Sequence, residues 1–75
     1  MNSYQSALAR HVELSGGQTA AAEKLGIRQA TLSRYIAGRR WPGSVMARLI
    51  DDKSGGQVPF AIWQAESLKR YGISL

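Results

Sequence analysis

Apolar residues recur at helical spacing near the N-terminus. Three of them lie four residues apart, on one face of a helix: Tyr4, Leu8 and Val12. Asn2 can cap this helix, with Gln5 reaching back to it as in a capping box, and Gly16-Gly17 ends it. The pattern therefore predicts a first helix with one apolar stripe, whose role is to support the rest of the fold.

Two short helical segments follow, separated by a glycine. Residues 18–25 are rich in good helix formers, and Gly26 directly after them suits the left-handed residue that ends a helix. Residues 29–37 form the second segment. Its apolar residues share one face, Leu32, Tyr35 and Ile36, and its polar or small residues share the other, Gln29, Ala30, Ser33 and Arg34. This arrangement predicts two helices joined by a tight turn, with the second held out from the body of the protein.

A fourth helix is predicted to begin between Pro42 and Ser44. Four apolar residues are expected to pack it on the other helices: Val45, Met46, Leu49 and Ile50. Trp41 is expected to pack beside Pro42. The acidic pair Asp51-Asp52, near the end of this helix, is expected to face away from the basic residues that precede it.

The tail, residues 58–75, supports two interpretations. Alternating apolar residues at its start fit a short edge strand: Val58, Phe60 and Ile62. Alternatively, Pro59 opens a fifth helix that ends at Gly72. On that helix Ile62 falls among charged residues and Trp63 lies beside them. Both interpretations therefore leave apolar side chains without an obvious partner inside the chain.

Self-association would bury these side chains. We therefore predict a homodimer whose interface includes Phe60, Ile62, Trp63 and Leu68. The competing interpretation is that they complete the core of the monomer, because a core of this size needs every apolar group it has.

Length and composition narrow the class of protein. The 75 residues allow one small domain over 1–75, and 44% apolar residues can form a core. The chain has no cysteine and a single histidine, His11, which is expected to be packed or on the surface rather than a metal ligand. We predict no enzyme activity, no metal and no cofactor. No apolar run is long enough to span a bilayer, so we expect a soluble, cytoplasmic protein.

The net charge of +5 is unevenly distributed. Six basic residues and no acidic one lie between positions 24 and 50: Lys24, Arg28, Arg34, Arg39, Arg40 and Arg48. The remaining positions carry four basic and five acidic residues, a net charge of −1. A solvated basic face explains such a run as well as nucleic-acid binding does. The overlap of this run with the two short helices favours nucleic acid.

The segment from Gln18 to Ala37, QTAAAEKLGIRQATLSRYIA, resembles the helix-turn-helix of Cro/cI-type phage and bacterial repressors. The following GRRWP, residues 38–42, is similar to a segment found after the recognition helix in these regulators, including small YdaS-like Cro homologues. Residues 50–58 are similar to the close of the fourth helix in that subgroup. The resemblance implies an all-α, lambda-repressor-like domain of four to five helices, and a protein that binds double-stranded DNA and regulates transcription.

The resemblance also implies which residues contact DNA. Base edges in the major groove would be contacted by Arg28, Gln29, Ala30, Ser33 and Arg34. Backbone phosphates would be contacted by Gln18, Thr19, Thr31, Arg39 and Arg40. An amide such as that of Gln29 suits adenine, and a guanidinium such as that of Arg34 suits guanine. Arg28 stands where a helix usually has a Ser, Thr, Asn or Asp cap, and this broken rule itself indicates a functional position.

The implied function is repression of transcription at an operator, by a homodimer acting at the nucleoid of a bacterial or phage-infected cell. RNA polymerase is a further potential partner. The alternative is a co-regulator that docks on polymerase or on another regulator and contacts DNA weakly. That alternative requires surface aromatic residues, Trp41 and Trp63, to matter more than Gln29.

Overall fold

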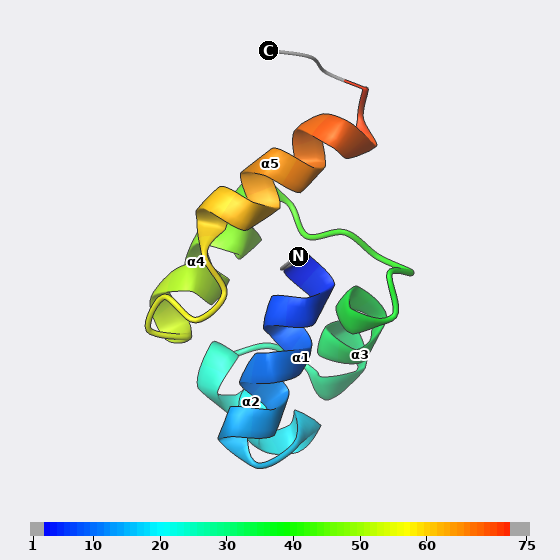
Figure 1. Ribbon diagram of the computed structural model, residues 1–75. Coiled ribbons are helices and arrows are strands. Elements are labelled where there is room, and N and C mark those ends of the chain that lie inside the picture. The colour runs from blue at the N-terminus through cyan, green and yellow to red at the C-terminus, as the bar shows by residue number, and fades with distance from the viewer. Residues whose placement is uncertain (1–2, 73–75) are drawn as a thin grey trace.

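The computed structural model describes residues 3–72 and places five α-helices in them (Figure 1). Their bounds are α1 Tyr4–Ser15, α2 Gln18–Leu25, α3 Gln29–Ile36, α4 Ser44–Lys53 and α5 Phe60–Arg70. The expected all-α fold is confirmed, and within the described range the tail forms a helix rather than an edge strand. In Figure 1, α1 runs through the middle of the view, with α3 to its right, α4 to its left and α5 above. No helix in this range is both long and apolar enough to cross a membrane.

The N-cap of the first helix lies one residue later in the chain than the N-cap predicted from the sequence. Ser3 is the N-cap, and its hydroxyl accepts a hydrogen bond from the Ser6 N–H at 3.0 Å. Asn2, the predicted cap, lies outside the described residues. Gly16 ends the helix in the left-handed conformation, with φ of 92°, as the glycine pair predicts.

One core joins all the helices. Its fully or almost fully buried members come from α1, α2, α3, α4 and the loop before α5: Tyr4, Leu8, Ala21, Ala22, Leu25, Leu32, Tyr35, Ile50 and Val58. The stripe predicted on α1 supplies two of them, and Val12 packs against their edge. The apolar face predicted for α3 supplies two more. Because these residues come from separate helices, the core holds the second and third helices against the first.

The fourth helix packs with only part of the face predicted for it, through Met46 and Ile50. Ala47 and Ile50 are buried and Met46 is half-buried, but Val45 is 82% exposed and Leu49 is 38% exposed. The prediction that Val45 and Leu49 pack on the bundle is therefore wrong. The four apolar residues spread over more than one face of α4, and only part of that surface is covered by neighbouring helices. The adjoining face, with Val45 and Leu49, remains in solvent.

The fifth helix also turns a different face inward. Ile62 and Trp63 are half-buried and pack against the core, so the expectation that they lack an internal partner is wrong. Trp63 donates its indole N–H to the Pro42 carbonyl at 2.8 Å. A helical wheel of the tail alone could not show this, because the partner is the loop between α3 and α4. On α5, Phe60 and Leu68 are half-buried, and Tyr71 just beyond it is 67% exposed.

Candidate nucleic-acid interface

The turn between α2 and α3 sets the direction of the third helix. Gly26 has φ of 69°, in the left-handed region that glycine enters without steric cost. The next residue, Ile27, donates its N–H to the Ala22 carbonyl at 3.0 Å and packs against the core. These contacts end α2 and start α3 within three residues, so the two helices meet at a sharp angle. The predicted helix-turn-helix is present.

The third helix is anchored on one side and exposed on the other. Leu32 is fully buried, Tyr35 is 5% exposed, and Ile36 packs against them. The polar face predicted from the sequence is exposed to solvent at every position: Gln29, Ala30, Ser33 and Arg34. No part of the described tail covers these four residues. The structure therefore presents one helix face with an amide, a hydroxyl and a guanidinium side by side.

Arg28 is the N-cap residue of α3, as the sequence predicts. Its backbone is extended, with φ of −72° and ψ of 144°, and its side chain makes no capping hydrogen bond. A poor cap of this kind costs about 1 kcal/mol of helix stability. The guanidinium is exposed beside the polar face of α3, so its charge adds to that of Arg34 on the same surface.

A hydrogen bond links the two helices at this surface. The Thr19 hydroxyl, in the first turn of α2, donates to Oε1 of Gln29, the first residue of α3, at 3.2 Å. The sequence pattern indicated Thr19 only as a phosphate contact and did not reveal this role. The spacing of ten residues across a glycine turn is the signal that could have revealed it. The Thr19 hydroxyl uses one lone pair of Oε1, so the amide NH₂ of Gln29 and the second lone pair of Oε1 remain free to meet a ligand.

The predicted phosphate-binding residues lie around the edge of this face. Thr19 is exposed, whereas Gln18 and Thr31 are half-buried. Arg39 and Arg40 are exposed in the loop after α3, where Gly38, with φ of 74°, turns the chain. The Arg39 N–H donates to the Arg34 carbonyl at 2.9 Å, which fixes the start of this loop to the last turn of α3. Both arginines therefore stand next to the end of the exposed helix.

Trp41, the next residue, turns inward. Its ring packs edge-on against Tyr4, with 5.3 Å between centroids, and its indole N–H donates to Ser67 Oγ at 2.9 Å. The sequence predicts that Trp41 packs beside Pro42; it does pack within the protein, with Tyr4 and Ser67 as its partners, while the Pro42 carbonyl accepts a hydrogen bond from Trp63. Trp41 and Trp63 thus both use their indole N–H groups inside the protein.

The acidic pair at the end of α4 is divided between two roles. Asp51 is half-buried, and its Oδ2 accepts the Phe60 N–H at 2.9 Å, which caps the start of α5. Asp52 is exposed. The sequence pattern did not predict the cap, because a loop separates the two residues. The Asp51 carboxylate is therefore held at a helix terminus instead of standing free in solvent.

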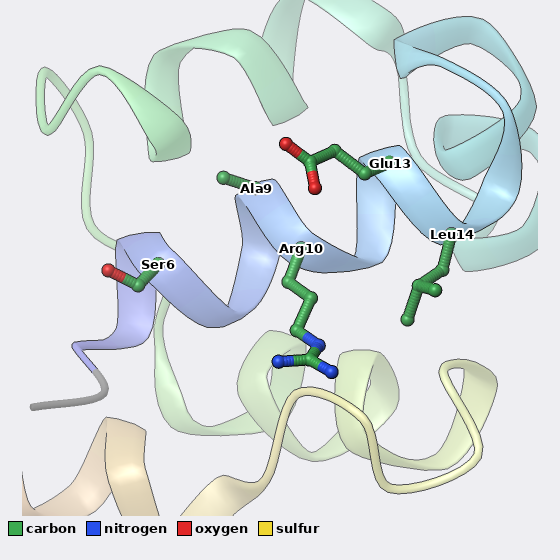
Figure 2. Close-up of a pocket in the computed structure, with 5 residues that line it drawn as sticks. All are labelled: Ser6, Ala9, Arg10, Glu13 and Leu14. Atoms are coloured by element: carbon green, nitrogen blue, oxygen red, sulfur yellow. The ribbon is translucent and has the colours of Figure 1, made fainter.

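A further hollow borders the exposed side of the first helix. A hollow on α1 is lined by residues of that helix alone: Ser6, Ala9, Arg10, Glu13 and Leu14 (Figure 2). Figure 2 shows the side chains of Arg10 and Glu13 pointing to opposite sides of the helix. His11 is buried, and its Nδ1 hydrogen bonds to Oε1 of Gln57 at 2.7 Å. Within residues 3–72 no group of three or more potential metal ligands occurs.

Comparison with known families agrees with the geometry. Residues 18–52, from the start of α2 almost to the end of α4, match the helix-turn-helix family HTH_3. The match supports the Cro/C1-type helix-turn-helix family, whose members are DNA-binding transcription regulators and not enzymes. No curated protein and no solved structure matches the chain. The matched segment includes the whole exposed face of α3 and both arginines of the following loop.

Proposed function

We propose that the protein reads a specific sequence of double-stranded DNA in the major groove with α3 and represses transcription by occluding a promoter. The observation that carries this proposal is the division of α3 into a buried apolar face and a fully exposed polar face. A major groove about 12 Å wide admits such a helix, and the first residues of the helix reach the base edges. The basic run in the sequence supplies the charge that attraction to phosphate requires.

Five residues would meet base edges. Gln29 and Arg34 carry the directional groups, Ser33 hydrogen bonds to several edges, and the Ala30 methyl packs against a thymine methyl. Arg28 reaches either a base or a phosphate from the start of the helix. The hydrogen bond from Thr19 leaves the Gln29 NH₂ free, which favours an acceptor on the base, such as adenine N7.

Five residues would hold the DNA backbone on either side of the groove. Gln18, Thr19 and Thr31 offer amide and hydroxyl donors at the starts of α2 and α3, and Arg39 and Arg40 offer charge after α3. Such contacts set register and affinity without reading sequence. Loss of either arginine therefore weakens binding to every duplex alike.

We further propose that the protein acts as a homodimer at the nucleoid, within the small YdaS-like subgroup of Cro-like regulators. The outward groups of the tail are Phe60 and Leu68, half-buried, and the exposed Tyr71. A dimer would present two copies of α3 to paired half-sites, which raises affinity without new kinds of contact. Ile62 and Trp63, which the core already uses, are not part of this proposal.

The co-regulator alternative has less support. It requires exposed aromatic surfaces on Trp41 and Trp63 to bind polymerase or another regulator. Both rings are half-buried, and both indole N–H groups are already hydrogen bonded within the protein. The exposed face of α3 has no role in that alternative.

Selection of bound duplexes from a random library tests the proposal. We expect one sequence to be enriched, and Gln29→Ala to weaken binding to it by about tenfold to a hundredfold, corresponding to roughly 1–3 kcal/mol. Binding to a scrambled duplex should change little. Gln64→Ala, the same change at an exposed position of α5, is the matched control. Failure to enrich any sequence, or equal losses on both duplexes, would refute sequence-specific reading.

A further inference from the structure

A second basic group lies outside the matched segment. Lys69 and Arg70 occupy the last turn of α5; Arg70 is exposed there. With three other residues they line a hollow of about 320 Å³, the α5 pocket: Gln5, Trp41, Glu66, Lys69 and Arg70. The hollow is open to solvent, so an anion can reach the charged groups in its wall.

The α5 pocket lies near the loop that follows α3. Trp41, in its wall, directly follows Arg39 and Arg40 in the chain. Gln5, also in its wall, lies beside the loop, since its amide nitrogen is 3.5 Å from where a Cβ on Gly38 would stand. In Figure 1 the C-terminal end of α5 and the loop after α3 lie on the same side of the molecule. The fold thus brings Lys69 and Arg70 to Trp41, the residue that follows Arg39 and Arg40 in the chain.

The pocket is built on fixed contacts. Trp41 is held between α1 and α5 by its edge-on contact with Tyr4 and its hydrogen bond to Ser67. The Arg70 guanidinium lies 4.7 Å from the centroid of the Trp41 ring, a cation–π contact. Stacking on a ring occupies the face of a guanidinium and leaves the N–H groups along its edge available for a bidentate anion. Arg70 is therefore oriented before any ligand arrives.

The one carboxylate in the pocket is already engaged. Oε2 of Glu66 accepts the Tyr4 N–H at 2.8 Å, at the start of α1. The positive end of the α1 dipole stabilises a negative charge at this place. Glu66 is half-buried, whereas both cations reach the surface. An incoming anion therefore meets Lys69 and Arg70 first.

We propose that the α5 pocket binds a phosphate of the DNA backbone outside the groove that α3 reads. Arg70 would bind it through the edge of its guanidinium, Lys69 would add a point charge, and the Gln5 amide would donate a further hydrogen bond. The pocket extends the contact with DNA beyond the helix-turn-helix and continues the line of Arg39 and Arg40. This inference rests on the proposed function, because it names a further part of the same DNA-binding surface.

The salt dependence of DNA binding tests the inference. Each lost phosphate contact lowers the slope of log K against log salt by about 0.9 and weakens binding by roughly fivefold to tenfold at about 0.1 M salt. We expect Lys69→Gln and Arg70→Gln to behave in this way on selected and scrambled duplexes alike. Lys53→Gln, at the end of α4, and Arg10→Gln, on α1, remove the same charges elsewhere and should leave the slope near that of the wild type. Lys69→Gln leaves the contact of Arg70 with Trp41 in place. It therefore tests the inference even if the Arg70→Gln variant does not fold.

Duplexes in which a single phosphate is uncharged locate the contact. Phosphates are replaced one at a time by methylphosphonates, and binding of the wild type is compared with that of Lys69→Gln. We expect one flanking position at which neutralisation weakens the wild type but not the variant. If the slopes of the α5 variants equal those of the controls, while Gln29→Ala still loses the selected sequence, this inference is overturned and the proposed function stands. If the wild type binds no duplex, both are overturned.

Discussion

At the scale of single residues, Gln29 shares its amide between the protein and solvent. Its Oε1 accepts a hydrogen bond from Thr19, which belongs to the neighbouring helix. A side chain held in this way loses less conformational freedom when it meets a base than one that rotates freely. The position of the amide in the groove is then set by the turn between α2 and α3 as well as by α3 itself.

Thr19→Val removes that hydroxyl and nearly preserves the volume of the side chain. We expect discrimination at the base pair read by Gln29 to fall severalfold, since a hydrogen bond of this kind contributes about 0.5–1.5 kcal/mol. Binding to scrambled duplexes reports separately on any phosphate contact of Thr19. In a Gln29→Ala background the discrimination should not fall further when Thr19→Val is added, which a double-mutant cycle measures. Independent losses from the two changes would show that Thr19 does not orient Gln29.

Tyr4 is a buried residue with an unsatisfied group. Its side chain is fully buried, and its hydroxyl has no hydrogen-bond partner within residues 3–72. Leaving such a group unpaired costs about 1–3 kcal/mol, so Tyr4→Phe is expected to leave the free energy of unfolding unchanged or raise it by about 1 kcal/mol. Chemical denaturation measures the difference. Tyr71→Phe, at a position 67% exposed, is the control and should have no effect.

The burial of Tyr4 also predicts that the stability of the protein falls at high pH. Burial raises the pKa of Tyr4 above its ordinary value of 10.0, and the nearby Tyr35 and Asp51 raise it further. The folded state therefore favours the protonated hydroxyl. The stability that this contributes is fully present below about pH 10 and is lost as the pH rises further. Tyr4→Phe should lose less stability than the wild type above that pH, and parallel losses in the two proteins would contradict this.

At the scale of elements, the tight turn after α2 requires glycine at position 26 because of its backbone conformation, not because a side chain there would clash. A Cβ at this position would meet no atom within 4 Å, but φ is 69°. Gly26→Ala is therefore expected to destabilise the protein by about 1–2 kcal/mol through the left-handed conformation alone. Thermal or urea unfolding measures the loss.

Gly43 provides the matched control. A Cβ added there would also stand in open space, and its φ of −75° is allowed for any residue. Gly43→Ala is expected to change stability by no more than about 0.5 kcal/mol, because a slightly poorer cap of α4 offsets a less flexible unfolded chain. Equal losses at the two glycines would contradict the role given to the φ of Gly26.

Some features of the helices could be predicted from the sequence and others could not. The bounds of α2, the start of α3, the turn between them and the inward residues Leu32 and Tyr35 follow from spacing and from one glycine. Prediction failed on α4, where Val45 and Leu49 are in solvent. A set of apolar residues does not say which of them a neighbouring helix covers, because that depends on the angle at which the two helices meet.

At the scale of the whole molecule, the fold brings basic residues of the tail to the segment that follows α3. Arg39 and Arg40 directly precede Trp41 in the chain, and the Arg70 guanidinium lies 4.7 Å from the centroid of the Trp41 ring. Glu66 and Asp51, by contrast, accept hydrogen bonds at the starts of α1 and α5.

The protein is expected to self-associate through α5. We expect Leu68→Gln to raise the dissociation constant of the homodimer at least tenfold, since burying a leucine contributes about 1.5–3 kcal/mol in each subunit. Val45→Gln, at a position 82% exposed on α4, should leave the dimer unchanged. Sedimentation equilibrium over a range of concentrations measures both. A wild-type protein that stays monomeric, or a dimer that dissociates only when Val45 is changed, would refute an interface through α5.

The helix-turn-helix and its outward face could be predicted from the amino-acid sequence. These features depend on interactions over a few residues: the spacing of apolar side chains, the conformational freedom of Gly26 and the run of arginines. Tertiary structure alone decided the inward faces of α4 and α5 and the pocket at the end of α5. The contacts that define that pocket join residues 26 to 62 positions apart, such as Trp41 with Ser67 and Tyr4 with Glu66. Periodicity reports which residues of a helix share a face, whereas only the packed molecule brings a particular neighbour to that face.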